Sequence, residues 1–277
     1  MTAEIIAMWA GVTFYALATV LYVAGMMFRR DVLMSWALRV AMAGMVPHIA
    51  GIGIRWVRIG HGPSLGFYEV VSSYALASVL ILAVLSWKFP KIRNIGVLIM
   101  PIAFLLLAGA MFTPKADLAL TAKLASWWLT IHVMFAKLTY TAFIASFAIA
   151  VAYLVRDRGG SGPLHDVLDK LPKQDVLDDL SFRFIGAGFI FLGIMIVAGA
   201  IWANEAWGRY WGWDPIETWS LISWVVYAVY LHVRLTLGWR GRRAAWFAAA
   251  ALPIVLFTLI GVPVAYQSIH GAYLLGY

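Results

Sequence analysis

The chain lacks cysteine and has few charged residues. Without cysteine it can form no disulfide, no thiolate metal site and no thiol nucleophile of its own. Lysine, arginine, aspartate and glutamate make up 12% of its 277 residues, against about 25% in an average soluble domain. These charges are too few to cover the surface of a soluble protein of this size, so lipid must cover the rest.

Apolar residues, by contrast, make up 63% of the chain. A helix needs about 17–25 mostly apolar residues to cross the hydrocarbon core of a membrane. Eight segments have this character: 5–28, 33–56, 68–87, 95–112, 127–155, 184–202, 217–236 and 245–264. The first lacks the basic region and cleavage site of a signal peptide, so we expect it to remain a span. The sequence therefore predicts an all-α polytopic membrane protein, with residues 1–277 as a single membrane domain.

The basic residues are distributed unevenly between the two sides of the membrane. The net charge is +8, and we interpret the excess as a signal of orientation, with no nucleic-acid partner, because lysine and arginine accumulate on the cytoplasmic side. Five lie on the side where the chain begins: Arg55, Arg58, Lys115, Lys123 and Arg209. Fourteen lie on the other side: Arg29, Arg30, Lys88, Lys91, Arg93, Arg156, Arg158, Lys170, Lys173, Arg183, Arg234, Arg240, Arg242 and Arg243. This distribution predicts an inner (cytoplasmic) membrane protein with both termini facing the periplasm or its equivalent.

The longest connection on the cytoplasmic side covers residues 156–183. It begins with Gly-Gly-Ser-Gly-Pro at 159–163 and continues with regularly spaced leucines and valines. The spacing predicts short amphipathic helices that are broken at Pro172 and lie on the membrane face. A plain surface linker is the alternative.

An outward connection, 202–219, is rich in tryptophan. Six of the fourteen tryptophans lie in it or just after it: Trp202, Trp207, Trp211, Trp213, Trp219 and Trp224. So many rings favour a stacking surface for a large flat apolar ligand, although an elaborate interfacial belt is the alternative. Gly208 and Gly212 let the backbone approach such a ligand closely. Asp214, followed by Pro215 and Glu217, is typical of a helix N-cap, which predicts an ordered scaffold.

This connection belongs to a longer set of motifs. Its central Trp-Gly-Trp-Asp at 211–214 is followed by Tyr-Leu-His-Val-Arg at 230–234. Further pieces occur in order: Gly-His-Gly-Pro at 60–63, Tyr-Glu at 68–69, Trp-Leu-Thr-Ile-His-Val at 128–133, Leu-Asp at 177–178, Arg183, Gly-Phe at 188–189 and Ile-His at 269–270. Together they closely resemble the WWD signature of the haem-handling protein family and, within it, the System II cytochrome c biogenesis branch of the CcsA or ResC type. The resemblance covers roughly residues 50–277. Ile216 departs from it, because the branch usually has a lysine there.

Two histidines lie at the level of the tryptophan-rich connection. His132 is near the outward end of the fifth span, and His270 lies just beyond the outward end of the eighth. Imidazole nitrogen is the commonest protein ligand of haem iron, and this placement would allow the two residues to hold a haem from both faces. Two unrelated hydrogen-bonded histidines are the alternative. The resemblance implies that His132 and His270 are the axial ligands of an external haem b.

His232 lies deep in the seventh span, about 22 Å below its outward end at 1.5 Å per residue. An ionisable residue at such a depth indicates a functional site. The resemblance implies that His232 is an axial ligand of a second haem in the membrane, and that the other ligand comes from a companion membrane protein of the CcsB or ResB type. His48 is the alternative partner within the chain, but its depth of about 12 Å matches poorly.

Haem also carries two propionates, which need cationic neighbours. Arg55, Arg58 and Arg209 are outward, and guanidinium pairs well with carboxylate. Anchoring of the second span at the headgroups is the alternative for Arg55 and Arg58. Lys137, which lies below His132 in the same span, is expected to face the same cavity.

The resemblance implies a haem-handling subunit of a cytochrome c synthase. Such a subunit moves haem outward and presents it to an apocytochrome c, whose thiols attach to it. Besides the companion protein and the apocytochrome, it implies partners that keep thiols reduced, of a membrane or thioredoxin-like type. Two other classes stay open: a b-type haem subunit for electron transfer, and a transporter of another aromatic or anionic solute.

Overall fold

A computed structural model of the chain describes residues 2–113, 115, 117, 121, 123–267 and 269. Every regular element among these residues is helical: α1 Thr2–Met27, α2 Asp31–Ile59, α3 Phe67–Lys88, η1 Pro90–Ile95, α4 Gly96–Met111, α5 Trp127–Arg158, α6 Pro163–Leu168, α7 Gln174–Trp207, α8 Pro215–Leu235, α9 Arg242–Leu256, η2 Phe257–Gly261 and α10 Val262–Ala265. Eight helical stretches are long and apolar enough to cross a membrane. The predicted all-α membrane architecture is therefore confirmed.

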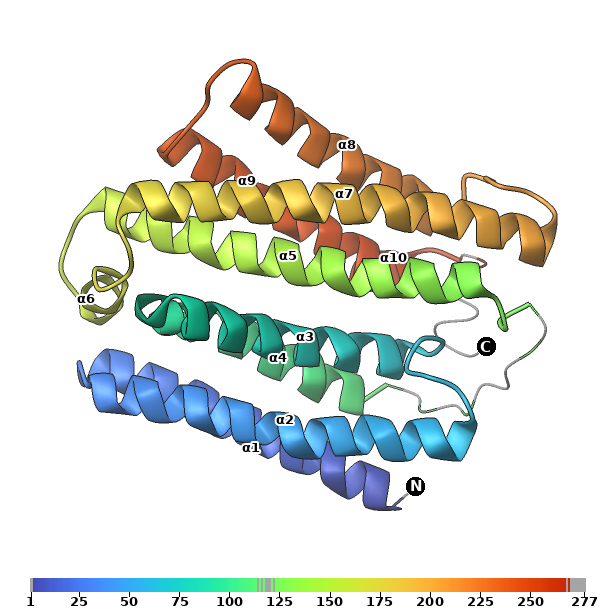
Figure 1. Ribbon diagram of the computed structural model, residues 1–277, viewed down its shortest axis with the longest axis horizontal. Helices are drawn as coiled ribbons and strands as arrows, with labels where there is room; N and C mark the ends of the chain where they lie inside the picture. Colours follow the sequence, from blue (N-terminus) through green and yellow to red (C-terminus); the bar gives the residue numbers. More distant parts are fainter. Residues whose placement is uncertain are drawn as a thin grey trace.

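The helices pack as neighbouring antiparallel pairs. Helix α1 packs on α2, α3 on α4, and α5 on α7, while α9 and α8 cover the side of α5 and α7 away from α1 (Figure 1). Small residues allow the close approach that stabilises helix pairs in lipid. A Cβ on Gly44 would lie 2.6 Å from Phe14 Cβ, and one on Gly188 would lie 2.4 Å from the Phe143 ring. Glycine at these two positions lets α2 meet α1 and α7 meet α5.

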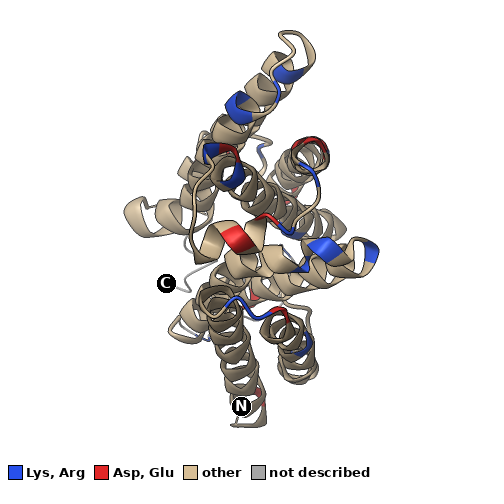
Figure 2. Cartoon of the chain, turned by 90° about the vertical axis from the view of Figure 1, so that its left-hand side faces the viewer, with Lys and Arg blue, Asp and Glu red and all other residues tan. Residues whose placement is uncertain are grey.

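Successive connections alternate between the two ends of the bundle (Figure 1). The α1–α2 turn, α6 and the α8–α9 turn lie at one end, which we call the α6 end. The α2–α3 connection, the α7–α8 loop and the N-terminus lie at the other, which we call the loop end. Lysine and arginine are prominent in the turns and helix ends seen from the α6 end in Figure 2. The fold thus brings together the basic connections on which the predicted orientation rests.

Residues 156–183 form fewer separate helices than the spacing predicts. Helix α5 continues to Arg158 and ends where Gly159 and Gly160 adopt positive φ. The short helix α6 is present, and Pro172 does interrupt the chain. The second predicted amphipathic segment is instead the first part of α7, which begins at Gln174 and runs without a break into the sixth span. No helix-breaking residue separates the two, so the helical ladder continues.

The eighth span is irregular at its loop end. Helix α9 passes at Phe257–Gly261 into a π-helical segment, η2, and then into α10. Pro263, in the first turn of α10, has no N–H to donate to the preceding turn. Such π segments occur frequently at functional sites. Here the segment places Thr258 and Leu259 in the lining of the cavity described next.

Candidate functional site

A cavity opens among α3, α5, α7, α8 and η2 near the loop end of the bundle. It contains about 820 Å³ of empty space, part of it open to the outside. Its walls are mainly apolar and aromatic, with His132 among them. His132 also lines a smaller cavity, together with Tyr210, Trp211 and Glu217. His132 therefore borders both the first cavity and a second one formed partly by the tryptophan-rich loop.

The imidazole of His132 is held in a defined orientation. Its Nδ1 lies 2.8 Å from the carbonyl oxygen of Met195 on α7. A carbonyl can only accept, so Nδ1 carries the proton and Nε2 is the basic nitrogen of the ring. A Cβ on Gly199 would lie 2.6 Å from His132 Nδ1, so the glycine provides the space that the ring occupies. This is the hydrogen-bonding arrangement that orients histidine as a metal ligand.

The tryptophan-rich connection is shorter than predicted, because both flanking helices extend into it. Helix α7 continues through Trp202 to Trp207 and ends at Gly208, which adopts φ 73° and donates its N–H to the carbonyl of Asn204. Helix α8 begins at Pro215, so only residues 208–214 are outside helices. A Cβ on Gly212 would overlap the guanidinium of Arg209. Gly212 thus accommodates Arg209, and Gly208 ends the helix.

Asp214 is the N-cap of α8, as predicted. Its Oδ1 accepts from the Ile216 N–H at 3.0 Å, and Glu217 completes the capping box by accepting from the Asp214 N–H at 3.1 Å. Its second oxygen, Oδ2, accepts from the N–H of Ile269 at 2.8 Å. One buried carboxylate therefore orders the start of α8 and binds Ile269 to the tryptophan-rich loop.

The six tryptophans of the motif form separate contacts. Trp202 is buried, lines the large cavity and packs edge to face on Trp207 at 4.9 Å, while Trp211 and Trp213 meet at 90°. The other two contact phenylalanines of neighbouring helices: Trp219 with Phe257 and Trp224 with Phe189. Trp213 is 69% exposed and has φ 56°, a conformation that few residues other than glycine adopt. Within the described part of the chain, Trp202 meets Trp207 and Trp211 meets Trp213 edge to face, whereas Trp219 and Trp224 contact phenylalanines.

His232 and His48 do not line this cavity. His232 is exposed on α8, with its Nδ1 3.4 Å from Thr236 Oγ1. His48 is fully buried on α2 and shares a hydrogen bond of 3.1 Å with the Tyr15 hydroxyl. Helices α2 and α8 lie at opposite edges of the bundle (Figure 1), so His48 does not meet His232. His270, the second predicted external ligand, lies outside the described residues.

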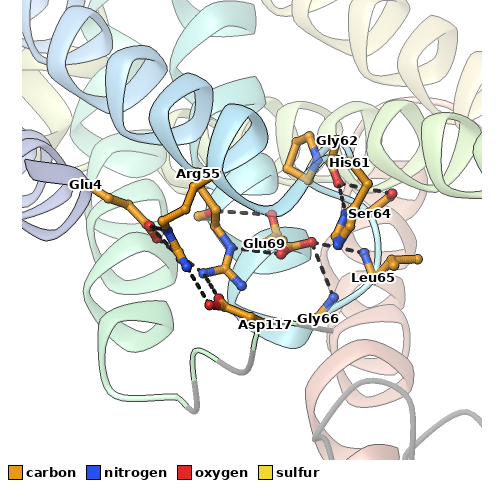
Figure 3. A network of polar contacts seen from close by, with 12 residues as sticks. Glu4, Arg55, His61, Gly62, Ser64, Leu65, Gly66, Glu69 and Asp117 are labelled. Carbon is orange, nitrogen blue, oxygen red and sulfur yellow. Dashed lines mark hydrogen bonds and ion pairs between the residues drawn. The ribbon is translucent and has the colours of Figure 1, made fainter. Parts of the chain in front are cut away.

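Arg55 and Arg58 bind carboxylates of the protein itself. Figure 3 shows Arg55 beside Glu4 and Glu69. Arg55 is 4% exposed and pairs with Glu69 at 2.8 Å and Glu4 at 3.3 Å. Arg58 pairs with Glu4 at 2.8 Å and also with Asp117. The Arg58 guanidinium lowers the pKa of the Asp117 carboxyl, so Asp117 stays ionised to lower pH. These pairs connect the loop-end termini of α1, α2 and α3. Both arginines therefore have a structural role within the protein.

Lys137 also has a partner that the sequence does not reveal. Its Nζ donates to the carbonyl oxygen of Pro63 at 2.8 Å, in the connection between α2 and α3. That connection, through Ser64 and Leu65, forms one wall of the large cavity. Lys137 therefore supports the wall of the cavity in which His132 lies.

Sequence reasoning missed several residues of the site. Glu4, Glu69 and Asp117 were not identified as partners of the two arginines, although three outward carboxylates near outward arginines were a usable signal. The Met195 carbonyl gives no sequence signal, because any residue supplies it. Tyr74 and Tyr140 line the cavity from α3 and α5, and they resemble ordinary apolar span residues in the sequence.

Comparison with known proteins identifies the family of this chain. Residues 64–270 match the family described as cytochrome C assembly protein. The cytochrome c biogenesis protein CcsA of Synechococcus sp. (strain CC9311) is 37% identical over 254 residues, covering 80% of this chain and 82% of that protein. CcsA of Chlamydomonas reinhardtii is 36% identical over 228 residues, covering 78% and 62%.

A solved structure shares the fold. The cytochrome c haem lyase CcmF superposes with a TM-score of 0.69 and 18% sequence identity, covering 99% of this chain and 48% of that chain. The chain thus spans about half the length of that protein. At this identity the likeness concerns the arrangement of the helices.

Proposed function

Because the chain belongs to the cytochrome c assembly protein family and matches CcsA-type members over most of its length, we propose that it is the haem-handling subunit of a cytochrome c synthase. In this role it moves haem to the outer face of the membrane and presents it for thioether attachment to an apocytochrome c. Haem b is its cargo, and the site at the loop end is where the cargo is held.

The orientation of His132 carries this proposal. Its Nδ1 donates to the Met195 carbonyl, which makes Nε2 the nitrogen that would bind iron. Apolar and aromatic side chains, including Trp202 and Tyr140, line the cavity together with His132. The residues present therefore fit a haem held by His132.

His270 is proposed as the second ligand. Its neighbour Ile269 donates to Asp214 in the tryptophan-rich loop, which supports a role for the C-terminal segment at the same site. Arg209, beside Gly212 in this loop, is proposed to pair with a propionate. Arg55 and Arg58 are proposed to act at the propionates only through the network that they form with Glu4, Glu69 and Asp117.

The chain contributes orientation and exclusion of water. Haem supplies the vinyl groups to which the thiols add. The thiols must come from the apocytochrome, because this chain has no cysteine. His132 holds the ring, the apolar walls keep water away, and the exposed Trp213 is proposed to meet the incoming apocytochrome. Holding the two reactants in register is the expected source of the rate enhancement.

His232 is proposed to belong to an earlier position on the route. It is sixteen residues after the cavity-lining Ile216 on the same helix, about 24 Å at 1.5 Å per residue. Its exposure on α8 suits a ligand shared with the companion protein of the CcsB or ResB type. This route requires the α6 end to face the cytoplasm of an inner membrane, with the tryptophan-rich loop outside.

Loss of maturation with chemical rescue tests the proposal. The protein is coexpressed with its companion and a reporter apocytochrome bearing Cys-x-x-Cys-His in cells without their own maturation system. We expect His132→Ala to lower the covalently bound haem of the reporter by about 100-fold or more, and added imidazole to restore part of it. His165→Ala, on α6 beside Asp169, is the control.

Two results would contradict the proposal. One is normal maturation in His132→Ala. The other is the absence of haem bands in the absorption spectrum of the purified wild-type protein, which would favour a transporter of another solute. An electron-transfer subunit would instead show haem bands but leave the reporter without covalent haem.

A further inference from the structure

One wall of the large cavity is a short non-helical connection. Residues 60–66, which we call the strap, link α2 to α3, and Ser64 and Leu65 of the strap face the cavity. Leu65 is 6% exposed and packs in an apolar cluster with Leu129, Val133 and Trp202. Two of these neighbours lie within three residues of His132 on α5. The position of the strap therefore determines how completely the space beside His132 is closed.

Two charged side chains, one on α3 and one on α5, contact the strap. The Glu69 carboxylate accepts from the backbone N–H of Leu65 at 3.1 Å and of Gly66 at 3.5 Å. Lys137 donates to the Pro63 carbonyl at 2.8 Å. Figure 3 shows the strap and Glu69 in the same network as Arg55. Within the strap, the Gly62 carbonyl accepts from the Ser64 N–H and from the Ser64 hydroxyl.

Glu69 is itself fixed by its neighbours. It is 2% exposed, and its other oxygen accepts from Arg55 Nε at 2.8 Å. Of the two residues, Lys137 has the larger free-energy cost of burial, because the charge of an amine within a membrane span needs a compensating partner. The Lys137 amine donates its hydrogen bond to the neutral carbonyl of Pro63 in the strap. The Pro63 carbonyl is neutral, so a neutral donor would satisfy it. The stability of the fold alone therefore does not require a charged partner for this carbonyl.

We infer that Lys137 and Glu69 are positioning residues that hold the strap closed against α5 and so control the entry and exit of ligand at the cavity of His132. The identity of that ligand as haem rests on the proposed function, but the closure of the cavity does not. Loss of the Lys137 contact releases the strap at Pro63, while the apolar core of the bundle is unchanged. The cavity then opens more often.

Thiol labelling tests this inference without any haem. Val133→Cys places a single thiol in the buried cavity wall, because position 133 is 8% exposed and the native chain has no cysteine. We expect a water-soluble maleimide to label this thiol about tenfold faster when Lys137→Met is added, the size expected for loss of one hydrogen bond from a charged donor. Lys137→Arg, which keeps a cationic donor, is expected to restore part of the slow rate.

Lys115→Met is the matched control. It also removes an amine that donates to a backbone carbonyl, that of Met111 at 2.6 Å, but does not touch the strap. We expect it to leave the labelling rate unchanged. Equal rates in Lys137→Met, Lys115→Met and the parent would overturn the inference. Glu69→Gln, which keeps the side-chain shape without the charge, is a second variant with the same expected increase, so slow labelling in both also overturns it.

Haem release separates this inference from the proposed function. In haem-loaded protein, transfer of haem to excess apomyoglobin is expected to be about tenfold faster with Lys137→Met. Protein that binds no haem would refute the proposed function, and the labelling result would still decide the role of the strap. Unchanged haem transfer together with faster labelling would overturn the assignment of the cavity to haem but not the closure by Lys137.

Discussion

At the scale of single residues, the site depends on backbone features that a sequence motif of side chains does not predict. The orientation of His132 is set by a backbone carbonyl and by the absence of a side chain at Gly199. Neither feature is a functional side chain. One is a backbone amide oxygen, and the other is the space left by the missing Cβ of a glycine. Both nevertheless decide which imidazole nitrogen carries the proton and where the ring lies.

Gly199→Ala should displace His132 without removing it. The added methyl group would lie 2.6 Å from Nδ1, so the ring must move and lose its hydrogen bond to Met195. We expect maturation of a reporter cytochrome to fall by about 10–100-fold, as for other changes next to metal ligands, together with an altered haem spectrum.

Gly186→Ala is the matched control for that change. It lies on the same helix, and a Cβ there would meet nothing within 4 Å. We expect normal activity and, because alanine favours helix, a stability that is unchanged or higher by up to about 1 kcal/mol. Equal activity of the two variants would show that the His132 ring does not need its observed position.

At the scale of elements, the tryptophan-rich segment is two helix ends joined by seven residues. Asp214 stabilises it twice, as the N-cap of α8 and as the acceptor from Ile269. The two functions use different oxygens of one carboxylate. The helix start and the C-terminal segment are therefore not independent of each other.

Substitution of Asp214 separates these functions. Asp214→Ala removes both acceptors, and the loss of the cap alone costs about 0.5–2 kcal/mol. We expect faster proteolysis of the C-terminal segment and a lower unfolding temperature. Asp214→Asn keeps one acceptor oxygen, so an intermediate effect is expected. If limited proteolysis cuts all three proteins at the same rate, the contact with Ile269 does not anchor the segment.

The sequence predicted the elements better than it predicted their ends and contacts. Length and apolar composition identify a span, so all eight were found. Whether residues 202–207 or 174–183 continue a helix depends on packing and on where glycine or proline interrupts the ladder, so α7 was predicted too short at both ends. Contacts between distant segments, such as Lys137 with Pro63, follow from the tertiary arrangement alone.

At the scale of the whole molecule, the basic residues near the α6 end predict that this end faces the cytoplasm. We expect Tyr210→Cys, at a position that is 60% exposed in the tryptophan-rich loop, to react with an impermeant maleimide in intact cells. Arg240→Cys, exposed at the α6 end, should react only after permeabilisation. The reverse pattern would invert the topology and place the candidate site inside.

His232 tests whether the molecule has two positions for haem. It is too far from the cavity of His132 to touch a haem there, so His232→Ala should lower the haem content of the protein when the companion subunit is coexpressed. The haem that remains should keep its spectrum, because the outer site is unchanged. A shifted spectrum with full haem content would point to a single site instead.

The unequal lengths of the helices have a consequence for the surrounding lipid. Helix α7 has 34 residues and α8 has 21, which correspond to about 51 Å and 32 Å, whereas the hydrocarbon core is about 30 Å thick. Helix α7 can meet bilayers of different thickness by exposing more or less of its ends. Helix α8 has no such reserve, and buried contacts fix it at both ends through Asp214 and Arg234. Hydrophobic mismatch therefore acts on α8 first, and lipid chain length becomes a physical variable that can shift the tryptophan-rich loop relative to His132.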